Sequence, residues 1–471
     1  MGNIDLLSIK RGLIVAPAGC GKTELITKAL KLNKEEKPIL VLTHTNAGVA
    51  ALRGRLSKLQ IQRRTYRLAT IDGWARRLAL TFPSRSEYKE KLNLIKLDYQ
   101  EIRKATRRLL KNNHITDILR ANYSRILVDE YQDCLTSQHE IVFYASLHLP
   151  TCILGDPAQA IFGFGADKLA KWEEHVCRRF PLVAELNKPW RWKNADNEEL
   201  GIWLLEKRQA LLAGKAIDIA KAPRSVKWIK LNDDTSDQNK LVSAAYCSFR
   251  ARGETLLVIG KSEQPKSRYE IAKRVSGLVT VEPVELEDLI VYARCLDQSN
   301  NSVVLKTLEF AKNLMTKVAI PKILGRLRSL KAKTAKKPAT DIEEAALSLE
   351  TNPSVQNIKT LLLKCSHQPE TRVYRPEILQ ATMHALSICE TSTNMSFEEA
   401  AIRVREEKRA IGRQLPKSAI GSTLLLKGLE ADHVVVLNAA NLNARNLYVA
   451  MTRGAKSVTL CSPTNILQPR K

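Results

Sequence analysis

One short run, Gly19-Cys20-Gly21-Lys22-Thr23, constrains this 471-residue chain more than any other feature. The apolar, half β-branched stretch Leu13–Ala16 before it predicts a short buried strand, and Glu24–Leu32 after it has the character of a helix. Glycines at such a junction let backbone N–H groups approach phosphate oxygens, and the helix N-terminus adds partial positive charge. The run therefore predicts a phosphate-binding loop.

Each position of this loop has a predicted task. The backbone of Ala18, Gly19, Cys20 and Gly21 surrounds the phosphates, Lys22 neutralises the outer ones, and Thr23 holds Mg²⁺. Ala16 stands where the usual pattern begins with glycine, so the match is to a variant, A-x-x-G-x-G-K-T. The alternative, a chance glycine turn before a helix, does not account for the lysine and threonine at these positions.

Two more strand ends carry polar residues. The strand-like run Ile126–Glu130 ends in Asp129 and Glu130, for which we predict metal binding and general-base catalysis, respectively. A third strand, Thr151–Gly155, is followed by Gln159, which could sense the γ-phosphate. A phosphate loop followed by an acidic strand end indicates an NTPase.

Two phenylalanines follow the third strand, at Phe162 and Phe164. They could offer stacking faces to nucleic-acid bases, an interaction of ~1–3 kcal/mol per base. Core packing is the alternative for either ring.

The amino-acid composition indicates the kind of partner that the chain binds. Lysine and arginine total 75 against 49 acidic residues, a formal net charge of +26, which favours a polyanion. Nine cysteines lie singly, without the spacing of a metal or redox site, which predicts reduced thiols and a cytoplasmic protein. The first apolar stretch is too short for a signal peptide, and no run is long enough to cross a membrane, so no membrane association is expected.

The ordered set of motifs resembles superfamily 1 helicases of the UvrD/Rep/PcrA type. In family order, the resembling segments are Leu42–Ala47 (motif Ia), Thr70–Trp74 (Ic), Val128–Asp133 (II), Gly155–Gln159 (III), Lys188–Arg191 (IV), Leu426–Glu430 (V) and Tyr448–Ala455 (VI).

The resemblance implies an α/β fold with two RecA-like domains, parallel sheets, and ATP with Mg²⁺ in the cleft between them. It makes Arg191 and Arg453 arginine fingers, which can contribute ~10³–10⁵ in rate. It places Trp190 on the base, Gly428 and Glu430 at the nucleotide, and Gln159 between γ-phosphate and DNA. The residues that it assigns to DNA contact are Thr43, His44, Asn46, Thr70, Phe162, Phe164, Thr423 and Lys427.

The sequence also departs from the family. The adenine-reading glutamine expected upstream of the loop is absent from the fifteen residues before Ala16, which raises the hypothesis that ATP, dATP and GTP are accepted with little preference. His44 replaces a phenylalanine and Asp72 replaces a histidine, while Phe162 and Phe164 replace tyrosine and tryptophan.

The expected organisation follows the motifs. Residues 1–190 form the first RecA-like domain, with a basic helical insert at about 80–122 that resembles a shortened 1B subdomain. Its basic side chains, Arg103 among them, either contact phosphates or form a solvated face. Residues 191–300 and 413–471 form the second domain, and residues 301–412 a reduced, helical 2B-like insertion.

Two functional hypotheses follow. The first is an ATP-dependent motor that moves along single-stranded DNA, 3′ to 5′ by resemblance, and separates duplex. The second is a DNA-stimulated ATPase that senses tailed or duplex DNA and regulates a partner nuclease in anti-phage defence, as in Gabija-type systems, with little unwinding of its own. A P-loop kinase or a transporter ATPase leaves the later motifs and the positive charge unexplained.

Overall fold

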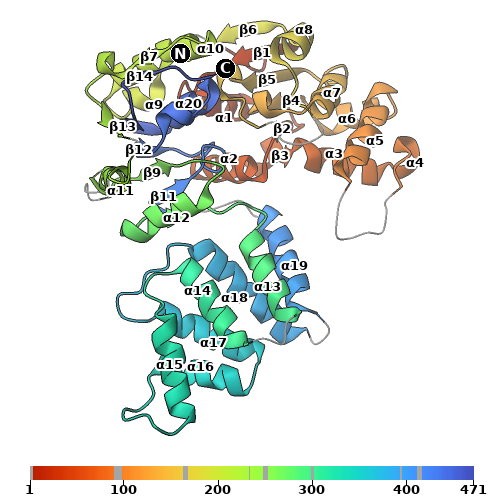
Figure 1. Cartoon of the computed structure of the whole chain (residues 1–471). Helices are drawn as coiled ribbons and strands as arrows, with labels where there is room; N and C mark the ends of the chain where they lie inside the picture. The colour runs from red at the N-terminus through yellow and green to blue at the C-terminus, as the bar shows by residue number, and fades with distance from the viewer. Residues whose placement is uncertain are drawn as a thin grey trace. The chain divides into compact units, whose positions relative to one another are not determined.

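The computed structural model describes residues 4–89, 98–162, 168–232, 234–247, 253–298, 302–392, 395–410 and 416–470. The chain divides into two compact units (Figure 1). The first is built around residues 4–231 and 428–470, and the second around 232–410 and 416–427.

The first unit contains a six-stranded sheet whose described pairings are all parallel. The strand order is β3-β2-β4-β5-β1-β6. Strands β2 and β5 are largely apolar and fully buried, as expected for a parallel sheet covered on both faces. The strands are β1 (Arg11–Val15), β2 (Ile39–Thr43), β3 (Tyr66–Thr70), β4 (Arg125–Val128), β5 (Thr151–Gly155) and β6 (Leu182–Glu185).

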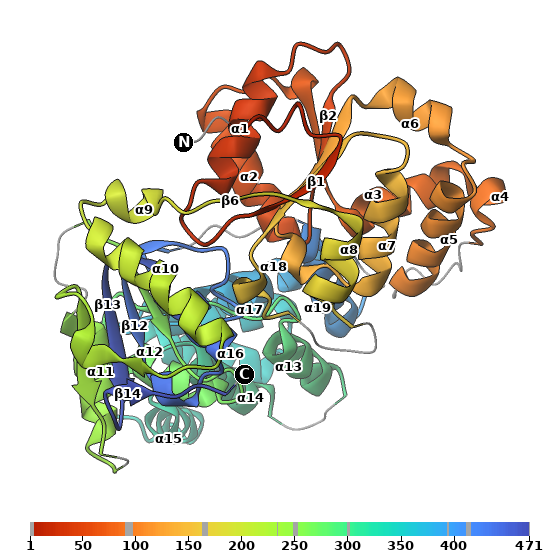
Figure 2. The same cartoon turned by 90° about the horizontal axis from the view of Figure 1, so that it is seen from above.

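Helices cover both faces of this sheet. Helices α1 (Lys22–Leu32) and α2 (Asn46–Lys58) lie on one side, and α3 (Ile71–Thr81), α5 (Tyr99–Lys111) and α7 (Thr136–Ala145) on the other (Figure 2). Each side has its own apolar core. The carboxyl ends of β1, β4 and β5, which carry the predicted site, meet at one edge of the sheet because all three strands run parallel.

The basic insert joins the core of the first sheet. Ile102 and Leu109 of α5, and Leu119 of α6 (Thr116–Asn122), are buried in the same cluster as strand residues of this sheet. Arg103 is also buried, and neither of the two sequence-based interpretations holds for it: its guanidinium donates to both carboxylate oxygens of Asp72, at 2.7 Å each.

Asp72 has a third partner in Gln138 of α7, whose Nε2 donates to Oδ2 at 3.0 Å. The aspartate at a position where the resemblance expects histidine thus ties α3, α5 and α7 together.

The second sheet also has six strands, in the order β10-β11-β9-β12-β13-β8, with parallel pairings where described. Together the two parallel sheets confirm the expected α/β fold, which is consistent with two RecA-like domains. The strands are β8 (Val226–Lys230), β9 (Leu256–Ile259), β10 (Val279–Thr280), β11 (Ser418–Gly421), β12 (Ala431–Val436) and β13 (Gly454–Ser462). A short antiparallel pair, β7 (Ile217–Asp218) with β14 (Ile466–Leu467), lies outside both sheets.

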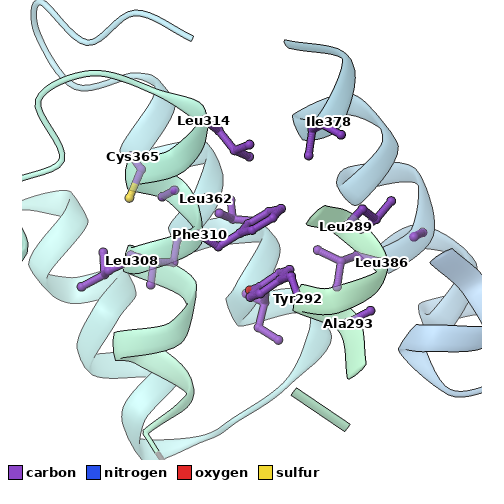
Figure 3. Packing of buried hydrophobic residues seen from close by; sticks show 14 of the residues in the cluster. Leu289, Tyr292, Ala293, Leu308, Phe310, Leu314, Leu362, Cys365, Ile378 and Leu386 are labelled. Carbon is purple, nitrogen blue, oxygen red and sulfur yellow. The ribbon is translucent and has the colours of Figure 1, made fainter. Parts of the chain in front are cut away.

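Residues 287–410 of the second unit are mainly helical and have their own core (Figure 1). Tyr292 and Phe310 stack at its centre, with ring centroids 3.9 Å apart and planes 5° from parallel (Figure 3). Tyr292 belongs to α13, so the helical core begins before residue 301, where the insertion was expected to start. The helices are α13 (Glu287–Asp297), α14 (Val303–Leu314), α15 (Ile320–Lys331), α16 (Asp341–Thr351), α17 (Val355–Ser366), α18 (Pro376–Thr391) and α19 (Phe397–Ala410).

Within the described ranges, no helix has the length and apolar character needed to span a bilayer. The cysteines whose side chains are described are all free thiols.

The Arg103–Asp72 pair gives a stability prediction. Arg103→Met should lower the free energy of unfolding by about 3 kcal/mol, because it leaves the partly buried Asp72 carboxylate without its cation. The measurement is urea unfolding of the full chain followed by tryptophan fluorescence.

Arg108→Met on the same helix is the matched control, because its ion pair with Glu87 is exposed. Arg108→Met should lower the free energy of unfolding by less than about 1 kcal/mol. Equal losses in the two variants would contradict the role assigned to Asp72.

Candidate functional site

The phosphate loop leaves β1 at Ala16, whose N–H donates to the carbonyl of Gly155 at 2.8 Å. Gly19 and Gly21 have φ angles of 69° and 92°, a region that side chains other than glycine rarely adopt. Gly21 is the residue before α1 and has no side chain to cap the helix, so the first N–H groups of α1 remain directed at the loop. This local geometry suits an anion.

Lys22 lies between two carboxylates that follow β4. Its Nζ is 2.9 Å from Oδ1 of Asp129 and 2.5 Å from Oε1 of Glu130. Burial by itself lowers the pKa of Lys22, but the charges of Asp129 and Glu130 outweigh it, and the net pKa is well above the usual value. Lys22 is therefore a cation at neutral pH, and two of its three donors are in use.

Glu130 is held in a strained conformation. Its backbone has φ 54° and ψ 40°, the left-handed region, which costs a residue other than glycine roughly 1–2 kcal/mol. Its Oε2 accepts a 2.6 Å hydrogen bond from Nε2 of Gln132. Gln132 in turn accepts the backbone N–H of Asp156 at its Oε1, at 3.0 Å. The side chain of Gln132 thus connects the acidic strand end of β4 with that of β5.

The segment after β5 reaches Arg453. Oδ2 of Asp156 accepts from Nε2 of Gln159 at 2.9 Å, and Oε1 of Gln159 accepts from the guanidinium of Arg453 at 3.2 Å. Arg453 is 3% exposed. Burial first, and the charge of Arg191 second, lower the pKa of Arg453 to about 10, so it remains a cation at neutral pH.

Arg191 is in direct contact with the phosphate loop. Its backbone N–H donates to the carbonyl of Gly19 at 3.1 Å, and its guanidinium donates to the carbonyl of Thr452 at 2.5 Å and to Oε1 of Glu430. The buried Nε of Arg191 has no hydrogen-bond partner among the described residues. A buried donor beside the loop is a place where an anionic oxygen would be stabilised.

The two tryptophans of the Trp-Arg-Trp run lie differently. Trp190, predicted to stack on the base, is half-buried, and Lys193 lies over its ring at 5.9 Å. Trp192 is fully buried, packs on Gly19, and donates from Nε1 to the carbonyl of Gly454 at 2.9 Å. Trp192 therefore connects the phosphate loop to the segment that follows Arg453.

The structure brings the predicted nucleotide residues Lys22, Asp129, Glu130, Gln159, Arg191, Arg453 and Glu430 into one set of contacts within the first unit. Gly428, in the same unit, is exposed with φ 80°. Cys20 is buried, and burial with the charge of Asp156 raises its thiol pKa to about 12.

The residues assigned to DNA contact differ from one another in exposure and in their contacts. The ring of His44 at the end of β2 lies 5.4 Å from that of Phe162, and Asn46 is exposed. Thr43 is 2% exposed, and Thr70 accepts the N–H of Gly73 as the cap of α3.

The remaining DNA assignments fall elsewhere. Phe164 lies outside the described residues. Thr423, which is buried, and Lys427 belong to the second unit.

The donor set fits Mg²⁺ with a nucleotide. No group of three or more His, Cys, Asp and Glu side chains suited to a metal exists among the described residues. Mg²⁺ in nucleotide sites needs only one or two protein ligands, because phosphates and water supply the others.

Asp129 has room for such an ion. Both of its described contacts, with Lys22 and with the N–H of Glu130, are made by Oδ1, which leaves Oδ2 for the metal. Lys22, Asp129 and Glu130 together carry a net charge of −1, so a cation is electrostatically favoured there.

Comparison with known proteins agrees with this geometry. Residues 79–170, about a fifth of the chain, match the family described as the UvrD/REP helicase N-terminal domain. The matched segment contains β4, β5 and the polar residues that follow them. No curated protein matches the chain. The match supports a UvrD-like superfamily 1 helicase, a class that binds nucleotide and DNA.

Sequence reasoning missed three residues of the site: Trp192, Gln132 and Arg208. Arg208 could have been noticed, because it follows Leu200 and Leu204 at a spacing of four and so lies on the apolar face of its helix. Nothing in the sequence indicates which tryptophan of the Trp-Arg-Trp run is buried.

Gly19 provides a test of the loop. Gly19→Ala should weaken binding of a fluorescent ATP analogue about tenfold, because its φ costs an alanine roughly 1–2 kcal/mol. The added Cβ would also lie 2.6 Å from the Trp192 ring. Binding is measured by fluorescence titration and folding by thermal unfolding.

Gly54→Ala is the matched control, since a Cβ there meets nothing within 4 Å and lies within α2. Its nucleotide affinity should equal that of the original chain, and its stability should be unchanged or higher by up to ~1 kcal/mol. If Gly19→Ala binds the ATP analogue as tightly as the unaltered chain does, the loop is not part of the nucleotide site.

Proposed function

We propose that this protein hydrolyses ATP with Mg²⁺ and couples hydrolysis to movement on single-stranded DNA, in the 3′ to 5′ direction, with separation of duplex ahead of it. The observation that carries the proposal is the single connected site formed by Lys22, the acidic pair after β4, and the two arginines. The match to the UvrD/REP helicase N-terminal domain supports DNA as the partner.

The chain's own residues divide the chemistry between them. The loop amides and the third donor of Lys22 bind phosphate oxygens, and Thr23 with Asp129 holds the Mg²⁺ that neutralises them. Glu130, which accepts from Lys22 and Gln132, can orient and deprotonate the attacking water. Arg191 and Arg453 stabilise the charge that develops on the transferred phosphoryl group.

Two features bear on DNA. The formal charge of +26 attracts a polyanion, and the His44–Phe162 ring pair offers aromatic faces to an unstacked base. Both are sequence-tolerant modes of binding, as a motor that moves along a strand requires. The expected relaxed preference among ATP, dATP and GTP is part of this proposal and is tested by comparing hydrolysis rates across the nucleotides.

Two site variants should separate binding from chemistry. Lys22→Ala should abolish hydrolysis and retain DNA binding, because it removes the cation that meets the phosphates. Glu130→Gln should bind nucleotide yet hydrolyse it about 10²- to 10⁴-fold more slowly. Hydrolysis is followed by phosphate release and DNA binding by fluorescence anisotropy.

Lys28→Ala, an exposed lysine on α1, is the control and should behave as the unaltered chain. Normal turnover in Lys22→Ala would overturn the assignment of the loop. A rate for Glu130→Gln equal to that of the unaltered chain would require another base.

The proposed function is tested by following hydrolysis and strand separation together on 3′-tailed, 5′-tailed and blunt duplexes. Stimulated hydrolysis with separation of the 3′-tailed duplex alone is the expected result. Separation of only the 5′-tailed duplex would reverse the polarity. Stimulated hydrolysis without separation on any substrate would replace the motor with a DNA-sensing ATPase.

A further inference from the structure

Arg208 is a buried arginine on α10 (Glu198–Leu212), which lies outside every motif noted in the sequence. It is 5% exposed and shares the apolar face of its helix with Leu200, Leu204 and Leu211. A cation on such a face is costly unless it is paired. The role of Arg208 is therefore argued from the groups with which it pairs.

The main partner of Arg208 is Asp156, which is 0% exposed. The Nε and one terminal nitrogen of Arg208 each lie 2.9 Å from Oδ1 of Asp156. The other terminal nitrogen lies 2.9 Å from Oε1 of Glu185, whose side chain is 47% exposed. Arg208 thus spans one buried and one exposed carboxylate, and only the buried one belongs to the site.

Asp156 holds the orientation of Gln159. The amide of Gln159 has one donating end and one accepting end. Because the donating end is bound to Oδ2 of Asp156, the accepting end is directed at Arg453. A neutral or rotated Asp156 would release this amide, and Arg453 would lose one of its four acceptors, the others being the carbonyls of Val449 and Leu429 and the hydroxyl of Thr452.

Asp156 also connects to the acidic pair. Its backbone N–H donates to Gln132, whose Nε2 donates to Glu130. The Asp156 residue therefore lies at the junction between the predicted base and the predicted arginine finger, and Arg208 is its counter-ion.

We propose that Arg208 is a positioning residue for NTP hydrolysis: by pairing with Asp156 it fixes Gln159 and, through it, Arg453 relative to Glu130. The proposal rests on the proposed function, because it assigns a role in that same hydrolysis. The described hydrogen bonds and ion pairs of Arg208 are with Asp156 and Glu185 and not with the phosphate loop or Lys22, so Arg208 is expected to act on the rate of the chemical step more than on nucleotide binding.

The test is steady-state hydrolysis of ATP by the full chain in the presence of single-stranded DNA. Arg208→Met should lower kcat about 10- to 100-fold, the usual cost of a small displacement of a catalytic group, and change KM by less than about threefold. Glu185→Gln is the matched control: it removes the charge of only the exposed partner of Arg208 and should keep kcat within about twofold of the unaltered chain.

A double variant separates positioning from general destabilisation. If Arg208 acts through Gln159, adding Arg208→Met to Gln159→Ala should lower kcat little further, because the connection is already cut. If the two losses multiply in full, or if Arg208→Met leaves kcat unchanged, the proposal is wrong. A loss of kcat in Glu185→Gln as large as that in Arg208→Met would also overturn the proposal.

Thermal unfolding of each variant checks that it folds. If Arg208→Met does not fold, Arg208→Lys decides, because it keeps the charge but not the two-pronged geometry. A several-fold loss of kcat in Arg208→Lys that disappears in the Gln159→Ala background supports the proposal, and unchanged kcat rejects it. Absence of hydrolysis in the unaltered chain would instead overturn the proposed function, so the two failures are distinguishable.

Discussion

The site depends on the placement of one buried ammonium group, that of Lys22, between two carboxylates. The strand order makes this possible. In the first sheet β5 lies between β1 and β4, so the residues after β5 lie between the phosphate loop and the acidic pair. Asp156 is the first of those residues, and its contacts in both directions follow from that central position.

The two glutamines of the site have a common function. Gln132 and Gln159 each use one end of a side-chain amide for Asp156 and the other end for a predicted catalytic group, Glu130 or Arg453. An amide cannot rotate without losing both bonds, so such a connection transmits orientation. Buried polar networks of this kind specify one arrangement only when every member is paired, which is why the counter-ion of Asp156 matters.

Much of this could be predicted from the sequence, because strands and phosphate loops are local patterns. The predicted strand at Thr151–Gly155 has the observed bounds of β5, and the parallel α/β fold is confirmed.

What could not be predicted involves long-range pairing. Asp72 and Arg103 are separated by 31 residues, and no periodicity reveals that they bind each other. The same holds for Trp192 on Gly19, and for α13, whose apolar face packs with the helical core although it precedes the expected boundary. The assignments to DNA contact remain predictions.

The charge of the hydrolytic site differs from that of the whole chain, and this difference distinguishes the proposed nucleotide binding from the proposed DNA binding. Four cations of the connected site, Lys22, Arg191, Arg208 and Arg453, accompany four carboxylates of the same site, those of Asp129, Glu130, Asp156 and Glu430. These charges balance, although the whole chain has a net charge of +26. The positive excess must lie elsewhere, where solvent and salt reach it. Because screening acts on exposed charges more than on buried pairs, ionic strength should govern the proposed DNA binding while leaving the geometry of the hydrolytic site unchanged.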